Sequence, residues 1–179
     1  MMTRMVADLP PLIHALCDPA RYPDGVARVE LVQTHISWVL LAGDFAYKIK
    51  KPVKLSFLDF STLALRHRYC LDELRLNRRF APDLYLEVVG IYNTPQDPQW
   101  QGFGAPIEYA VRMHRFEESA RLDHVCARGE LQAKHLSGLA DVLVAFHQAA
   151  AVAPAGSRFG SDQHILQPAL DNFTDLLRV

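Results

Sequence analysis

The alternation of apolar and polar positions predicts three short strands between residues 29 and 50. Segments 29–33 and 38–42 are rich in bulky apolar residues, and segment 45–50 alternates in character. The interruption at 34–37 and the Gly43-Asp44 turn are short, as in antiparallel hairpins. We therefore expect an antiparallel meander. Because strand side chains alternate, the third strand has one face of Phe45, Tyr47 and Ile49 and another of Ala46, Lys48 and Lys50.

One helix and two further strands follow this meander in the pattern. Asp59 and Ser61 are N-cap candidates for a helix over about residues 62–79, and Pro82 stops it. Segments 84–91 and 107–113 are strand candidates, separated by a segment rich in Pro and Gly. The order strand-strand-strand-helix-strand-strand predicts an α+β fold, with a five-stranded antiparallel sheet and one inserted helix.

The segments before and after the predicted sheet have patterns that predict helices and loops rather than strands. Residues 12–17 form a short helix candidate, and the prolines and Gly25 after it break the chain. From residue 117 onward the pattern is helical, with Leu136, Leu139 and Leu143 near helical period within 131–151, and a last helix from 168. We therefore divide the chain into an N-terminal helix and loop (1–28), a sheet-containing lobe (29–116) and a helical part (117–179).

Composition fits one globular domain of 179 residues, with 50% hydrophobic and 22% charged residues. No apolar run approaches the ~20 residues of a membrane span, so we expect no membrane contact. The net charge is −1, but the charges are unevenly distributed. Residues 48–79 form a basic block with nine Lys and Arg and only three acidic residues. Such a block suits phosphate groups, and it equally suits an ordinary solvated helix face.

The three cysteines, Cys17, Cys70 and Cys126, are widely spaced and form no C-x-x-C motif. No spacing of His, Cys, Asp and Glu resembles a metal site, so we expect no metal ligands in this chain. The start of the chain has no apolar targeting core. These features favour the cytoplasm, where thiols stay reduced.

Lys48 and Glu73 are the residue pair that indicates a functional site. Lys48 lies on the third predicted strand, and Glu73 lies mid-helix among small or apolar neighbours, whereas Asp72 lies among arginines. Glu73 is therefore the better candidate to face the sheet. In kinase lobes a strand lysine paired with a helix glutamate holds nucleotide phosphates. The alternative is that Lys48 is a solvent-facing edge lysine.

Several blocks of the sequence extend this comparison to a family. Ala46-Tyr47-Lys48-Ile49 resembles the Ala-x-Lys strand of protein-kinase-like folds. Over about residues 29–150 the chain resembles bacterial aminoglycoside-phosphotransferase-like proteins, which often continue into a P-loop ATPase or kinase half. The resemblance rests on Thr34-His35-Ile36-Ser37-Trp38, Tyr47-Lys48-Ile49-Lys50-Lys51-Pro52-Val53, Phe57-Leu58-Asp59-Phe60-Ser61-Thr62 and Glu73-Leu74-Arg75-Leu76-Asn77-Arg78-Arg79. It implies a protein-kinase-like small lobe followed by the first helices of an incomplete large lobe.

The resemblance also implies a nucleotide site for ATP with Mg²⁺. Lys48 would contact the phosphates, Glu73 would position Lys48, and Ala46 would line the site. Backbone groups of Met113, His114 and Arg115 would meet the adenine. The turn formed by Thr34, His35, Ile36 and Ser37 would cover the phosphates; it contains no glycine, and its Thr34 and Ser37 hydroxyls would replace glycine amides.

The catalytic part of that family is missing from the sequence. No His-Gly-Asp occurs, so no catalytic base or metal-binding Asp is assigned, and we do not expect the chain alone to transfer phosphate efficiently. The expected function is an ATP-binding lobe of a small-molecule kinase whose phosphoryl acceptor the sequence does not specify. The alternative is a non-catalytic kinase-like module that binds a protein partner or its own downstream lobe. RNA binding through the basic block ranks a distant third.

Overall fold

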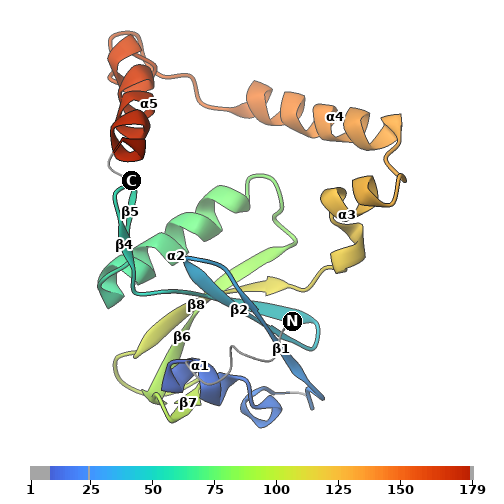
Figure 1. Cartoon of the computed structure of the whole chain (residues 1–179), viewed down its shortest axis with the longest axis vertical. Coiled ribbons are helices and arrows are strands. Elements are labelled where there is room, and N and C mark those ends of the chain that lie inside the picture. The colour runs from blue at the N-terminus through green and yellow to red at the C-terminus, as the bar shows by residue number, and fades with distance from the viewer. Residues whose placement is uncertain (1–8, 24, 178–179) are drawn as a thin grey trace. The chain divides into compact units, whose positions relative to one another are not determined.

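A six-stranded antiparallel sheet dominates the computed structural model, which describes residues 9–23 and 25–177. Its strand order is β1-β2-β3-β8-β6-β7 (Figure 1). The strands are β1 (Val29–Gln33), β2 (Ser37–Ala42), β3 (Phe45–Lys50), β6 (Tyr85–Thr94), β7 (Asp97–Gln99) and β8 (Glu108–His114). The mixed α/β class and the predicted strands are confirmed, with small changes at their ends.

The meander β1-β2-β3 is antiparallel, as predicted. Val29 pairs with Ala42, and Ala42 pairs with Phe45 across a two-residue turn. Gly43 in that turn has a φ of 57°, a left-handed conformation that suits glycine in tight hairpins. Strand β3 continues into the sheet by pairing with β8, so Ala46 lies opposite Met113. The Lys48 strand is thereby flanked on both sides by other strands.

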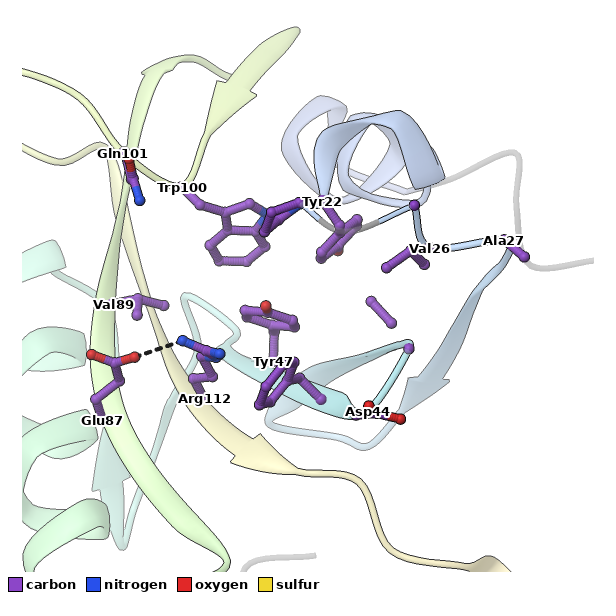
Figure 2. A pocket seen from close by; sticks show the side chains of 15 residues that line it. Tyr22, Val26, Ala27, Asp44, Tyr47, Glu87, Val89, Trp100, Gln101 and Arg112 are labelled. Atoms are coloured by element: carbon purple, nitrogen blue, oxygen red, sulfur yellow. Dashed lines mark hydrogen bonds and ion pairs between the residues drawn. The ribbon is translucent and has the colours of Figure 1, made fainter.

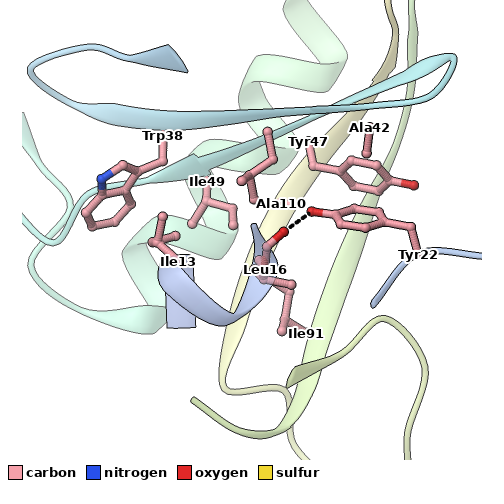
Figure 3. Close-up of a cluster of buried hydrophobic side chains, with 10 residues drawn as sticks. Ile13, Leu16, Tyr22, Trp38, Ala42, Tyr47, Ile49, Ile91 and Ala110 are labelled. Atoms are coloured by element: carbon pink, nitrogen blue, oxygen red, sulfur yellow. Dashed lines mark hydrogen bonds between the residues drawn. The ribbon is translucent and has the colours of Figure 1, made fainter. Parts of the chain in front are cut away.

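One face of the sheet packs on the N-terminal helix α1 (Pro11–Leu16), which is followed by the 3-10 turn η1 (Pro19–Arg21). Ile13 and Leu16 of α1 are buried against Leu40 and Ile49 in a single apolar cluster (Figure 3). The alternation of β3 is confirmed, because Tyr47 and Ile49 belong to this cluster and Lys48 does not. Burying these side chains contributes roughly 1.5–3 kcal/mol each to folding.

Helix α2 (Leu63–Asn77) contacts the sheet through β8 and β6, with its Glu73 joined to lysines of β3. The predicted caps Asp59 and Ser61 are wrong: the N-cap is Thr62, whose hydroxyl accepts from the backbone N–H of Leu65 at 3.2 Å. Asp59 instead accepts from the Ser61 backbone N–H at 3.0 Å, which stabilises the turn before the helix.

The expectation of five strands is corrected to six in the sheet, with a separate two-stranded hairpin of β4 (Lys54–Leu55) and β5 (Leu58–Asp59). The missed sheet strand, β7, contains Pro98, which cannot donate to a ladder. It lies at the edge of the sheet, where such a residue is tolerated. The segment that reads as a loop in the sequence therefore includes a short hairpin.

The helical part divides at residue 131, since one compact unit extends to Leu131 and a second begins at Gln132. The first unit ends with η2 (Glu118–Ala120) and α3 (Leu122–Ala127). The second contains α4 (Ala133–Ala149) and α5 (Asp162–Leu176). The predicted start of the last helix at 168 is wrong, because α5 begins at Asp162 and includes Pro168. In the described part of the chain, no helix has the length and apolar character to cross a membrane.

Candidate functional site

The carboxylate of Glu73 is shared by two lysines of strand β3. Lys48 Nζ lies 2.7 Å from Glu73 Oε1, and Lys50 Nζ lies 2.6 Å from Oε2. Asp72, by contrast, is half-buried and pairs with the exposed Arg68 and Arg75 of α2. The predicted orientation of Glu73 toward the sheet and its pairing with Lys48 are therefore confirmed.

Alternation along β3 explains why two lysines meet one carboxylate. Positions 48 and 50 are two residues apart, so both side chains leave the same face of the strand. Lys50 is nearly buried, with 6% of its side chain exposed, and its ammonium also lies 4.8 Å from the centre of the Phe60 ring. Lys48 is 29% exposed, so it is the lysine with access to solvent.

Electrostatics keep Glu73 ionised. Burial alone raises the pKa of a carboxyl group, but the charges of Lys48 and Lys50 and their hydrogen bonds outweigh burial, so the pKa of Glu73 is lowered. A charged Glu73 can hold both ammonium groups by charge-assisted hydrogen bonds. Lys48 is thus fixed by its partner on the helix and remains reachable from outside.

A largely apolar cavity of about 260 Å³ adjoins Lys48 on this face of the sheet. Its walls include five of the predicted nucleotide-site residues besides Lys48. These are Thr34, Ala46, Met113, His114 and Arg115, and the remaining lining residues are Val32, Val39, Leu41, Leu84, Tyr85, Phe116 and Glu118. The strands β1, β2, β3 and β8 therefore bring together residues from 32 to 118 around one opening.

Most of the turn at residues 34–37 does not line this cavity. The Thr34 hydroxyl accepts from the Ser37 backbone N–H at 3.0 Å, which ties the turn together. Ser37 is fully buried, and His35 is exposed without lining the cavity. Neither Ile36 nor Ser37 lines the cavity, so only Thr34 of this turn is brought to Lys48.

The expected backbone contacts at 113–115 are also limited by hydrogen bonds within the chain. The His114 N–H donates to Leu84 O at 2.9 Å, and the Arg115 N–H donates to Asp44 O at 2.8 Å. A ligand in the cavity would therefore meet the side chains of these residues and the remaining carbonyl groups rather than these two amides.

Two features of this region were not predicted from the sequence. Lys50 shares the face of Lys48, and that alternation was a usable signal for its contact with Glu73. Arg66 and Glu108 form a buried pair, with Arg66 Nη2 at 2.8 Å from Glu108 Oε2. Arg66 also donates to Phe60 O at 2.9 Å, so it connects α2, β8 and the preceding turn. Their separation of 42 residues left no local signal.

A metal cluster is not found among the described residues: nowhere do three or more His, Cys, Asp or Glu side chains converge. Glu118 is the only acidic residue that lines the cavity beside Lys48 among those described. The residues that line this cavity do not fit a protein-held Mg²⁺ site.

Comparisons with known proteins find similar but functionally undescribed relatives. Proteins of Mycobacterium bovis and of two Mycobacterium tuberculosis strains, each called an uncharacterized protein, are 37% identical over 122 residues. The match covers 68% of this chain and 23% of each relative, so the chain corresponds to less than a quarter of their length. No family model and no solved structure matches the chain.

Proposed function

We propose that this chain is the ATP-binding lobe of an aminoglycoside-phosphotransferase-like small-molecule kinase. The observation that supports the proposal best is the position of Lys48, which lines the cavity of about 260 Å³ and is held at 2.7 Å by Glu73. A fixed ammonium at the rim of an apolar cavity suits a ligand with a flat apolar part and a charged phosphate chain.

Each residue has a definite part in this proposal. The base of ATP lies between Val32, Ala46 and Met113, and the phosphates lie against the Lys48 ammonium. Glu73 is a positioning residue, and Lys50 keeps Glu73 charged and in place when Lys48 turns toward phosphate. Mg²⁺ would accompany ATP as its counter-ion, without ligands from the described residues, and no step is assigned to it.

The proposal concerns binding rather than complete catalysis. Because the sequence contains no His-Gly-Asp, the proposal assigns no residue of this chain as catalytic base or metal-binding Asp. The acceptor is a small molecule of unspecified class, and the compartment we expect is the reducing cytoplasm. A downstream lobe or a separate protein would supply the remaining groups.

A thermal-shift experiment with MgATP tests the proposal. MgATP raises the melting temperature of the wild-type chain, because a ligand that binds only the folded state stabilises it. Lys48→Ala abolishes the shift. Lys54→Ala is the matched control, since it removes the same charge from an exposed residue outside the cavity and leaves the shift unchanged. An equal shift in Lys48→Ala contradicts the role of Lys48.

A second candidate function is a non-catalytic protein-interaction module. Helix α4 supports it, since Leu136, Leu139 and Val142 are each about half exposed. Exposed apolar stripes are typical of surfaces that meet a partner. This candidate predicts binding of a hydrophobic dye that is reduced by Leu136→Ser with Leu139→Ser. A strictly monomeric chain that binds no dye contradicts it.

A further inference from the structure

Tyr85 is a polar residue of the cavity beside Lys48 that has no role in the account so far. Its half-buried side chain lines that cavity of about 260 Å³, the proposed nucleotide cavity, together with Met113. Tyr85 lies on β6, and β8 lies between β6 and the lysine strand β3. Because the cavity is largely apolar, a hydroxyl group on its wall affects which ligand it can bind.

A β-bulge in β6 turns the Tyr85 side chain toward this cavity. Glu87 pairs with Arg112 and Tyr85 pairs with the next residue, Met113, so Leu86 is an extra residue between them. In a regular strand, residues 85 and 87 would share one face. Glu87 instead lines a separate cavity of about 510 Å³, where Figure 2 shows it joined to Arg112, whereas Tyr85 lines the nucleotide cavity. Bulges that redirect a side chain in this way are frequent beside functional sites.

Arg78 fixes the backbone of this bulge. It is the C-cap residue of helix α2. Its guanidinium group donates from Nε to Tyr85 O at 2.8 Å and from Nη2 to Leu86 O. Two carbonyl groups of the bulge are therefore tied to the helix that carries Glu73. This contact sets the position of Tyr85 relative to the helix carboxylate.

The Tyr85 hydroxyl is an available hydrogen-bond donor. Within the described part of the chain it makes no hydrogen bond, and it is not one of the fully buried polar atoms that lack a partner, so it keeps contact with solvent. Burial raises the pKa of Tyr85, and the Glu73 carboxylate raises it further against a smaller effect of Lys48. The phenol therefore keeps its proton at neutral pH and can donate it to a ligand oxygen.

The charges around this hydroxyl favour an anionic acceptor. Lys48 and Lys50 carry two ammonium groups against the one carboxylate of Glu73, so this cluster has one net positive charge. Glu118, which also lines the cavity, pairs with Arg121 at 3.0 Å. A phosphate oxygen beside the lysine ammonium would accept a charge-assisted hydrogen bond.

We propose that Tyr85 is a further binding residue of this cavity, and that its hydroxyl donates to an oxygen of the phosphate chain whose charge Lys48 neutralises. This inference rests on the proposed function, because it assigns a second phosphate contact in the same cavity. Lys48 supplies the charge, and Tyr85 supplies a hydrogen bond of fixed direction.

NMR titrations that follow the Met113 methyl signal, with MgATP and with adenosine as ligands, test this assignment. Tyr85→Phe keeps the ring and removes the hydroxyl, so the affinity for MgATP falls by about 10-fold. The response to adenosine, which has no phosphate, is unchanged. Tyr92→Phe is the matched control, since it removes a hydroxyl from the same strand outside the cavity and alters neither titration.

Three results overturn the inference. Equal MgATP affinities of the wild-type chain and Tyr85→Phe remove the role of Tyr85, and the proposed function stands if Lys48→Ala still weakens binding. Equal losses for MgATP and adenosine indicate altered packing of the ring rather than a lost phosphate contact. An absence of MgATP binding by the wild-type chain overturns the proposed function and this inference with it.

Discussion

Lys50 Nζ and Glu73 Oε2 lie 2.6 Å apart, with 6% of the Lys50 side chain exposed. This contact makes Glu73 the common partner of two ammonium groups. In the proposed function, Lys48 therefore turns from Glu73 to a phosphate while Lys50 still compensates the carboxylate. The arrangement separates two roles on one strand, since Lys50 anchors the helix carboxylate and Lys48 is the accessible cation.

Because two lysines share the Glu73 carboxylate, substitutions of Glu73 and of Lys50 lower the free energy of unfolding by different amounts. Glu73→Ala leaves the nearly buried Lys50 without its anion and lowers the free energy of unfolding by about 3 kcal/mol. Lys50→Met keeps the Glu73–Lys48 pair and a similar volume, so it costs about 1 kcal/mol. Urea unfolding of both variants measures whether Glu73→Ala lowers the free energy of unfolding more than Lys50→Met does. Equal losses contradict the view that Lys50 depends on Glu73.

Acid stability also depends on Glu73. Its folded-state pKa is lowered from the ordinary value of 4.5, so its contribution is present above that value and is lost as the pH falls through the folded-state pKa. The wild-type free energy of unfolding therefore decreases more steeply than that of Glu73→Gln below about pH 5. Parallel pH curves of the two proteins, from urea titrations, contradict this prediction.

The buried pair of Arg66 and Glu108 connects helix α2 to strand β8. Glu108→Ala leaves the Arg66 guanidinium, about one-tenth exposed, without its anion and costs about 3–5 kcal/mol. Arg66→Leu with Glu108→Leu removes both charges and recovers a large part of that loss. Chemical unfolding of the single and double variants measures the coupling. Additive losses contradict a direct interaction between the two side chains.

Reactivity of the cysteines tests the burial of α2. Cys70 is fully buried, and burial raises its pKa to about 12, whereas Cys126 is exposed. A thiol reagent at neutral pH therefore modifies Cys126 rapidly and Cys70 only after unfolding, because the thiolate is the reactive form. Peptide mapping after brief labelling identifies the sites. Early labelling of Cys70 contradicts the packing of α2 on the sheet.

The strands and the Glu73 orientation could be predicted because local patterns determine them. Alternation along 45–50 identifies the core face, and the helical neighbours of Glu73 distinguish it from Asp72. Strand β7 was not predicted because it contains Pro98, and proline is atypical of strands. The contacts among Tyr22, Tyr47 and Trp100 were not predicted because these rings meet only after the sheet and its N-terminal cover have formed. Such long-range contacts leave no periodic signal.

Binding of nucleotide beside Lys48 is the central claim, and Met113 offers a direct probe of it. The chain has four methionines, and Met113 lines the cavity beside Lys48. In a spectrum of methionine methyl groups, assigned with Met113→Leu, MgATP shifts the Met113 signal saturably in the wild-type chain and in Lys54→Ala. Lys48→Ala strongly weakens that response. An unmoved Met113 signal, or the same titration curve in Lys48→Ala, contradicts the account.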